Sequence, residues 1–247
     1  MKCGENCNCS NHKYCARKIS LFDSLSEKEL EKVVELITKY RYEKGETVFI
    51  EGEVFDKLFI IDKGSIKVYK NTIEGKEQIL YLLKEGEFIG DLNLLKRDIF
   101  NFSATALEET KICSISKADF DNLIRSNPEI SIKLLEYAHD RIANLEDLVQ
   151  TLNTKDVEVR LATLLSSLAK TFGVKTEKGI EITLPVTREE MASFIGVTRE
   201  TISRKLSKFQ EDGVIEIVQN KIILGMGDSH QGDCHLSQIQ LGISRYL

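Results

Sequence analysis

The sequence predicts an α+β fold with an N-terminal β-sandwich or barrel, a long central helix and a C-terminal helix-turn-helix. Three observations predict it. Short apolar runs alternate with glycine between residues 41 and 116, an apolar heptad runs from residue 138 to 152, and two capped helical segments meet at Gly196. The chain has 247 residues, which suits two modest domains. The expected divisions are 1–18 for a cysteine-rich head, 19–129 for the β-rich part, 130–153 for the long helix and 154–247 for the last part.

Composition and charge exclude several classes of protein. Hydrophobic residues make up 42% of the chain and charged residues 30%, which is ordinary for a globular protein. No apolar run approaches the ~18–20 residues of a membrane span, and the polar N-terminus does not resemble a secretory signal peptide. We therefore expect a cytoplasmic protein without a membrane partner. A formal net charge of −5 argues against a general polyanion binder but permits a local basic patch.

The head, residues 1–18, is polar and carries four cysteines, Cys3, Cys7, Cys9 and Cys15. In a reducing compartment such clustering indicates metal binding or redox chemistry rather than a disulfide framework. The other two cysteines are solitary. A lone cysteine within a strand, such as Cys113, is ordinarily a small core residue. Cys234 lies in a polar tail, and one cysteine does not build a cluster.

The β-rich part opens with a helix and continues with strands. Ser26 and Glu29 form a capping box ahead of an apolar stripe that reaches Ile37, which predicts the helix. Five apolar runs then predict strands at residues 47–50, 57–61, 65–69, 78–82 and 111–115. Glycines separate these runs, as in the turns of β-sandwiches and barrels.

A heptad seam predicts the long helix and its role. Its apolar residues are spaced four and three apart, and they are Ala138, Ile142, Leu145, Val149 and Leu152. Such a seam packs against a second helix in a parallel coiled coil. We therefore expect these residues to form the interface of a homodimer, with burial inside the chain's own core as the alternative.

The last part begins with a second helix, predicted from Val159 to about Phe172. A strand is predicted at residues 180–184, and a hairpin around Asn220 pairs Val214–Val218 with Lys221–Leu224. From Gly225 onward the chain is polar and has no period.

Residues 187–206 predict a helix-turn-helix between that strand and the hairpin. Thr187 and Glu190 form a capping box for the first helix, Gly196 permits a left-handed turn, and Thr198 caps the second helix. Four apolar residues are expected to face inward, namely Met191, Ile195, Ile202 and Leu206.

The outer face of the second helix carries the side chains expected to bind DNA. Arg199, Glu200, Ser203 and Arg204 lie on its first turns, where a recognition helix presents side chains to base edges. Arginine suits guanine, glutamate accepts from cytosine, and serine contacts base or phosphate. The further DNA contacts that we expect are Thr198 and Lys205. A solvated charged hairpin is the alternative, which the caps, turn and inward apolar residues together disfavour.

The segment Thr-Arg-Glu-Thr-Ile-Ser-Arg at 198–204 resembles the recognition helix of the CRP/FNR regulators (cyclic AMP receptor protein and the fumarate-nitrate-reduction regulator). Gly-Glu-Phe-Ile-Gly-Asp-Leu at 86–92 is similar to the β-roll motif of the family's sensor domain. The resemblance covers nearly the whole chain. It implies a β-roll sensor, a dimerisation helix and a winged helix-turn-helix that binds double-stranded DNA at a palindromic operator. It also implies that RNA polymerase is a partner and that this protein is not itself an enzyme.

The cyclic-nucleotide branch of the family holds the ribose with Gly-Glu and the phosphate with a later Arg-Ser. This chain has Gly90-Asp91 in the first place but Phe102-Ser103 in the second. A phenylalanine cannot neutralise a cyclic phosphate, which argues against cyclic AMP, although Arg97 keeps a cation nearby.

The cysteines are similar to the oxygen-sensing FNR pattern, in which an N-terminal run and the roll together ligate a [4Fe–4S] cluster. The resemblance implies that the ligands are Cys7, Cys9, Cys15 and Cys113, and that the signal is oxygen, nitric oxide or redox state. The family has two residues between its first two ligands, whereas Cys7 and Cys9 have one between them. Cys3 therefore stays an alternative to Cys7.

Other sensors and enzymes remain alternatives to a cluster-based regulator. Four thiolates also suit zinc, with His12 as a further ligand, which describes a zinc or thiol redox sensor. Haem, with His12 or His139 as ligand, or a small molecule describes a different sensor. An iron–sulfur enzyme is disfavoured because no substrate-site motif is present.

The base preference is partly readable. Glu200, Ser203 and Arg204 resemble the FNR reading triad, whereas Arg199 resembles the extra arginine of the cyclic AMP branch. A half-site of TTGAT, TGTGA or the blend TTGTGA is expected.

Overall fold

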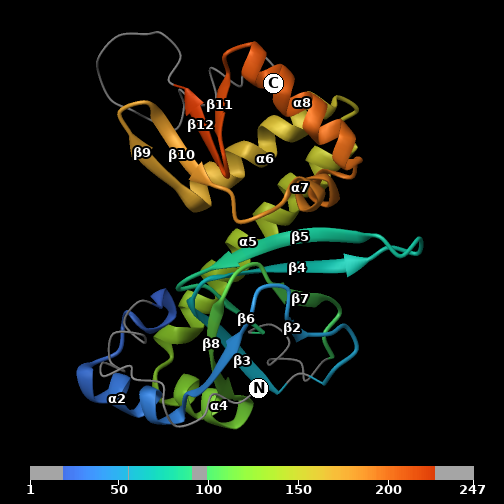
Figure 1. The fold of residues 1–247 in the computed structure, drawn as a ribbon. Helices are drawn as coiled ribbons and strands as arrows, with labels where there is room; N and C mark the ends of the chain where they lie inside the picture. The colour runs from blue at the N-terminus through green and yellow to red at the C-terminus, as the bar shows by residue number, and fades with distance from the viewer. Residues whose placement is uncertain (1–18, 55, 91–98, 226–247) are drawn as a thin grey trace. The chain divides into compact units, whose positions relative to one another are not determined.

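The computed structural model describes residues 19–54, 56–90 and 99–225. It divides into two compact units, Met1–Leu145 and Glu146–Leu247 (Figure 1). The head cysteines Cys3, Cys7, Cys9 and Cys15, together with Cys234, lie outside the described residues. Across the part of the chain that the structure describes, no helix has the length and apolar character needed to span a membrane.

Within its described residues, the first unit contains two four-stranded antiparallel sheets. One has the order β1 (Thr38–Tyr42), β8 (Thr110–Ser116), β3 (Lys57–Lys63) and β6 (Phe88–Ile89). The other has the order β2 (Thr47–Phe49), β7 (Ser103–Ala106), β4 (Ser65–Asn71) and β5 (Glu77–Lys84). All five predicted strands are present, so the predicted β-sandwich is confirmed. The apolar pattern of the sequence did not predict β1, β6 and β7.

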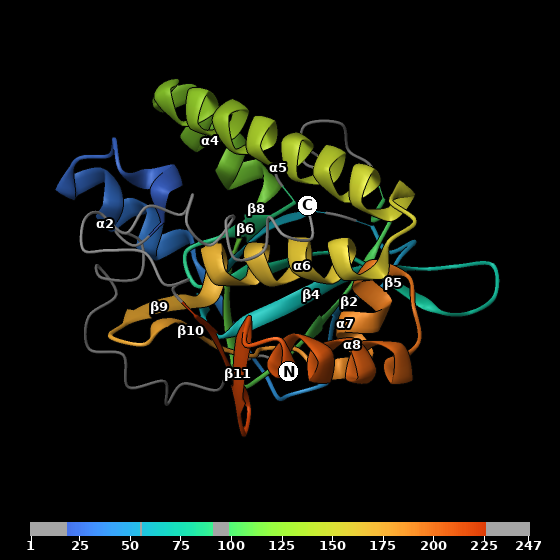
Figure 2. The same ribbon diagram turned by 90° about the horizontal axis from the view of Figure 1, so that it is seen from above.

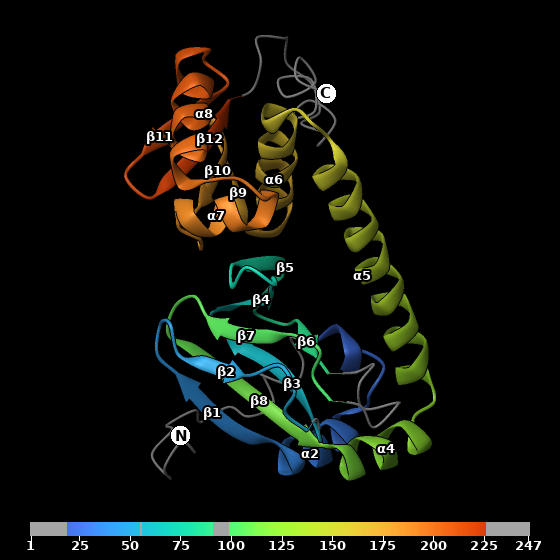
Figure 3. The same ribbon diagram turned by 90° about the vertical axis from the view of Figure 1, so that its right-hand side faces the viewer.

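Alternation along β3 defines the two faces of its sheet. The Phe59 ring lies 5.9 Å from that of Phe49 on β2, so Phe59 faces the second sheet. Its neighbours Leu58 and Ile60 therefore point to the opposite face, where both are fully buried. Figures 1 and 3 show helices on that face. They are η1 (Ser20–Phe22), α2 (Glu27–Leu36), α4 (Lys117–Ser126) and the start of α5 (Glu129–Asn153).

Two of these helices confirm the predictions made for them. The capping box at the start of α2 is present, with Glu29 Oε2 accepting from the Ser26 N–H at 2.8 Å. Helix α5 is continuous over 25 residues, about 37 Å at 1.5 Å per residue, and contains neither glycine nor proline. The predicted seam therefore lies on one unbroken helix.

Within its described residues, the second unit combines the end of α5, three further helices and one sheet, and Figure 2 shows these three helices grouped beside the sheet. The helices are α6 (Val157–Phe172), α7 (Arg188–Ile195) and α8 (Arg199–Glu211), and the strands, in sheet order, are β11 (Ile215–Val218), β12 (Lys221–Gly225), β10 (Gly179–Thr183) and β9 (Gly173–Thr176). The predicted hairpin around Asn220 is β11–β12. Helix α6 begins two residues before the predicted Val159, because Asp156 caps it by accepting from the Glu158 N–H at 2.7 Å.

Candidate nucleic-acid interface

The helix-turn-helix forms where the sequence predicts it. The Thr187 hydroxyl accepts from the Glu190 N–H at 3.2 Å, and the Glu190 carboxylate accepts from the Thr187 N–H at 2.8 Å. This capping box begins α7, and Thr198 caps α8 by accepting from the Thr201 N–H at 3.3 Å. The inward residues of the prediction are all fully buried, namely Met191, Ile195, Ile202 and Leu206.

The turn between the two helices is held by glycine and by α6. Gly196 has φ +66° and ψ +46°, the left-handed conformation that L side chains adopt only at a cost. Arg160 of α6 donates from Nη1 to the carbonyl oxygen of Ile195 at 2.6 Å, at the end of α7. The contact spans 35 residues of sequence, and no local pattern predicts it.

The outer face of α8 carries most of the predicted DNA contacts. Thr198, Arg199, Glu200 and Arg204 are exposed. Ser203 is half-buried, and its hydroxyl accepts from Arg188 Nη1 at 3.3 Å. Arg188, the first residue of α7, therefore adds a cation beside this face.

Lys205 does not lie with these exposed side chains. Its ammonium donates to Glu158 Oε1 of α6 at 2.7 Å, and Lys208 donates to the same oxygen at 2.7 Å. These two hydrogen bonds lower the pKa of the Glu158 carboxyl below its ordinary value. Glu158 is only 8% exposed. Its two bonds to Lys205 and Lys208 connect α8 to the first turn of α6.

Cys113 is the one proposed metal ligand within the described ranges. It lies on β8 opposite Lys39 of β1 and Ile60 of β3, and it is 2% exposed. Ile60 points to the helix-covered face, so Cys113 points there too. Among the described residues, no group of three or more His, Cys, Asp or Glu side chains is placed to hold a metal ion.

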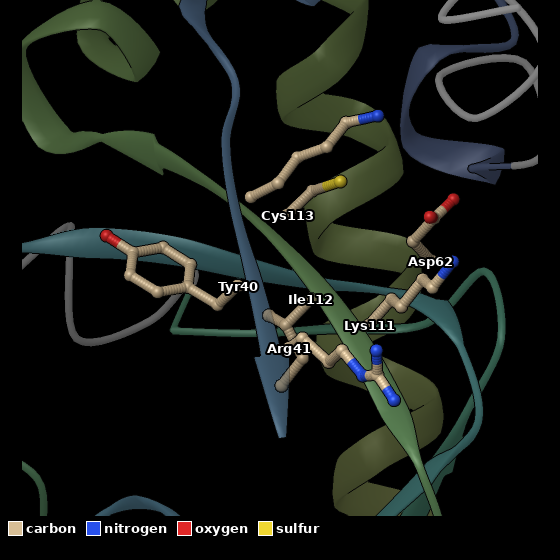
Figure 4. Close-up of a pocket in the computed structure, with 7 residues that line it drawn as sticks. Tyr40, Arg41, Asp62, Lys111, Ile112 and Cys113 are labelled. Carbon is tan, nitrogen blue, oxygen red and sulfur yellow. The ribbon is translucent and has the colours of Figure 1, made fainter. Parts of the chain in front are cut away.

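Cys113 shares the lining of a small pocket with charged side chains (Figure 4). The charged members are Lys39, Arg41, Asp62 and Lys111. Three of these four side chains carry positive charge.

Phe102 stands where the cyclic-nucleotide pattern has the arginine that binds the phosphate, and its ring packs among other aromatic rings. The Phe102 ring lies 5.9 Å from those of Phe49 and Phe100, and 6.4 Å from that of Tyr81. The Ser103 hydroxyl is buried and accepts from the Glu51 N–H at 3.0 Å. Asp91 and Arg97 lie outside the described residues.

Arg141 on α5 binds the β-roll in a way that the heptad pattern does not predict. Its Nη2 donates to the Phe88 carbonyl oxygen at 2.9 Å. Its guanidinium carbon lies 4.8 Å from the Tyr137 ring centroid and 5.2 Å from that of Tyr81, within cation–π range. Burial raises the pKa of the neighbouring Glu87 carboxyl. A hydrogen bond donated by the Lys84 N–H acts in the opposite direction, but the effect of burial is larger.

Two family models match the chain. Residues 39–127 match the cyclic nucleotide-binding domain, and residues 159–225 match the Crp-like helix-turn-helix domain. The chain is 32% identical over 202 residues to electron transport regulator A of Shewanella oneidensis, covering 81% of this chain and 80% of that protein.

Relatives at lower identity are named for different regulatory roles. The fumarate and nitrate reduction regulatory protein of Salmonella typhimurium is 28% identical, with 83% of this chain and 82% of that protein covered. The CRP-like cAMP-activated global transcriptional regulator of Mycobacterium tuberculosis is also 28% identical, with 84% and 92% covered. Among solved structures, a mutant of CooA from Carboxydothermus hydrogenoformans superposes with a TM-score of 0.69 at 24% identity, covering 86% of this chain and 90% of that one.

Proposed function

The chain belongs to the CRP/FNR family of transcriptional regulators, and from that premise we propose a cytoplasmic homodimer that binds a palindromic operator and acts with RNA polymerase. One observation carries the DNA-binding part. Arg199, Glu200 and Arg204 are exposed together on α8, while the opposite side of that helix is buried. Base edges in the major groove are read by side chains of these types on such a helix.

The proposed dimer uses the exposed stripe on α5. Leu135, Ile142 and Val149 follow one another at seven-residue intervals and are 71%, 54% and 60% exposed. Leu145, between Ile142 and Val149, and Leu152, just after Val149, are half-buried, whereas Ala138 is buried. Apolar side chains at heptad spacing are covered when a second copy packs against them. The two recognition helices of such a dimer read half-sites about 34–36 Å apart, one turn of DNA.

We assign residues 19–129 to sensing, 130–153 to dimerisation and 154–247 to DNA binding, with residues 1–18 as the metal-binding head. The proposed ligands of a [4Fe–4S] cluster are Cys7, Cys9, Cys15 and Cys113, with Cys3 as the alternative to Cys7. When bound, the cluster supplies an oxidant-sensitive centre that oxygen, nitric oxide or redox state would change.

Two features of the structure support this ligand set. Ile19 is 2% exposed and belongs to the same core as Cys113. Cys15 lies four residues before Ile19, so its Cα is within about 14 Å of that of Ile19. The cations Lys39, Arg41 and Lys111 beside Cys113 also suit a thiolate cluster of net negative charge.

We propose that cyclic AMP is not the signal. A cyclic phosphate needs a cation, and in its place the Phe102 ring packs among Phe49, Phe100 and Tyr81. Titration with cyclic AMP under conditions where the protein binds DNA checks this, and tighter operator binding on titration would contradict it.

The test of the whole proposal starts from protein purified without oxygen. We expect broad brown visible absorbance, stoichiometric iron and sulfide, and preferential binding of a palindromic duplex with TTGAT or TGTGA half-sites over a scrambled one. Air should bleach the colour and weaken operator binding. Cys113→Ser should lose the cluster, whereas the control Cys234→Ser should keep it. A sharp Soret band would indicate haem instead of an iron–sulfur cluster. Colourless protein with bound zinc would indicate a zinc–thiol sensor.

A further inference from the structure

We propose that Glu158 is a positioning residue that limits sequence-independent DNA affinity, because it holds two lysines of the recognition helix away from DNA phosphates. The inference rests on the proposed DNA-binding function and assigns a role to a residue of α6 that does not itself touch DNA. Its basis is the bond pattern in which Lys205 and Lys208 both donate to Glu158 Oε1 at 2.7 Å.

The carboxylate is fixed where it can hold both ammonium groups. Glu158 lies in the first turn of α6, where its N–H donates to Asp156 Oδ1 and where the helix dipole favours a negative charge. Its side chain is 11% exposed, against 26% for Lys205 and 48% for Lys208. A buried acceptor thus draws two longer side chains inward from the edge of α8.

Without Glu158, the two lysines would extend toward DNA. Lys208 lies four residues after Arg204, so the two share nearly one helix face, and the Arg204 face is the exposed one. Lys205 and Lys208 are three residues apart, and two unpaired ammonium groups at that spacing repel each other. The partners nearest to an exposed recognition helix in a DNA complex are the phosphates along the groove.

Phosphate contacts raise affinity for every sequence, whereas base contacts discriminate among sequences. The group of Glu158, Lys205 and Lys208 has a net charge of +1, in place of +2 for the lysines alone. Glu158 therefore lowers sequence-independent binding and leaves discrimination to Arg199, Glu200, Ser203 and Arg204.

The decisive variant is Glu158→Gln, which keeps the shape and removes the charge. Its matched control is Glu181→Gln, because Glu181 also accepts from a lysine, Lys221, at 2.7 Å, but within the sheet rather than on α8. Binding of full-length dimers to a palindromic and a scrambled duplex is measured by fluorescence anisotropy between 50 and 200 mM salt.

For Glu158→Gln we expect tighter binding of the scrambled duplex and a slope of log K against log salt that is steeper by about 1–2 per protomer. The palindromic duplex should gain affinity by a similar factor, so selectivity should stay near the wild-type value, because phosphate contacts are made on any sequence. A slope equal to that of Glu181→Gln, or an equal loss of affinity for both duplexes, would overturn the proposal, since either means that Glu158 only supports the fold.

A second variant tests the same inference even if Glu158→Gln does not fold. Lys205→Gln/Lys208→Gln should leave the scrambled-duplex slope within about 0.5 of wild type, because these lysines are already held off the phosphates. A slope shallower by about 1–2 would mean that they contact phosphates in the presence of Glu158, and the inference would be wrong. Wild-type protein that binds both duplexes equally would instead refute the proposed operator binding.

Discussion

Arg160 and Ile195 are joined by a hydrogen bond of 2.6 Å from the guanidinium Nη1 to the last carbonyl oxygen of α7. The bond ties α6 to the turn of the helix-turn-helix. Arg160 Nε is buried and donates to no acceptor within the described residues, so the guanidinium is retained at a desolvation cost. The bond to Ile195 is the interaction that we expect to offset this cost.

Arg160→Met should destabilise the second unit by about 1–3 kcal/mol, because the Ile195 carbonyl loses its donor. Urea unfolding followed by circular dichroism measures the change. The exposed Arg125 of α4 supplies the control, since Arg125→Met should stay within about 0.5 kcal/mol of wild type. Equal stabilities for the two variants would show that the bond contributes nothing.

Gly196→Ala should cost about 1–2 kcal/mol because a Cβ is unfavourable at φ +66°. The cost is one of backbone conformation, since the added Cβ would lie 3.6 Å from Leu152 and 3.8 Å from Arg160, ordinary contact distances. Gly196→Asn should cost less, as asparagine tolerates this conformation better. The same unfolding assay applies, and an alanine variant no less stable than the asparagine variant would argue against this explanation.

Arg204→Ala should weaken operator binding by about 1–3 kcal/mol and relax the preference at one guanine. The measurement is a panel of duplexes with single base-pair changes in each half-site. Glu181→Gln, on a different element, should keep the wild-type pattern of preferences. An identical loss on every duplex would identify Arg204 as a phosphate contact.

Ile142→Glu should shift the proposed dimer toward monomer, because it places a charge in the centre of the exposed apolar stripe of α5. Sedimentation analysis measures the mass. Ala143 is exposed one position further along and outside the seam, so Ala143→Glu should remain dimeric. If both variants sediment as wild type does, the interface lies elsewhere.

Stability should depend on pH through Glu158. The lysines lower its pKa in the folded chain, so the carboxylate stabilises the fold above the unfolded-state pKa of about 4.3. That contribution disappears as pH falls through the folded-state pKa. The difference in unfolding free energy between wild type and Glu158→Gln should thus be largest near neutral pH and shrink in acid. A difference that does not change with pH would exclude an ionic role.

Local signals predicted the parts of the fold that depend on neighbouring residues. The boxes at Ser26 and Thr187 and the turn at Gly196 each involve groups within a few residues, so the sequence specifies them directly. Strand β1 was missed because it alternates polar and aromatic residues at the edge of its sheet and has no apolar run. Strand β7 was missed because Ser103–Ala106 contains only small side chains, whose burial depends on the sheets around it.

In the candidate nucleic-acid interface, too, local features could be predicted from the sequence and long-range contacts could not. The exposed positions of α8 follow from helix periodicity, and the sequence predicted Arg199, Glu200 and Arg204 there. Lys205 belongs to the same helix, but a carboxylate 47 residues earlier determines where its ammonium lies. Arg188 of α7 donates to Ser203 of α8 across 15 residues of sequence, so this contact depends on how the two helices pack. Contacts between distant segments depend on packing that no spacing rule describes.

Arg141 and Ile142 are consecutive residues of α5, about 100° apart around its axis. One is bonded to the Phe88 carbonyl of the roll, and the other is exposed on the apolar stripe. An unbroken helix rotates as one body, so torsion that frees the guanidinium also swings the isoleucine through the same angle. Substitutions in this turn should therefore affect both the attachment of α5 to the roll and the proposed subunit pairing.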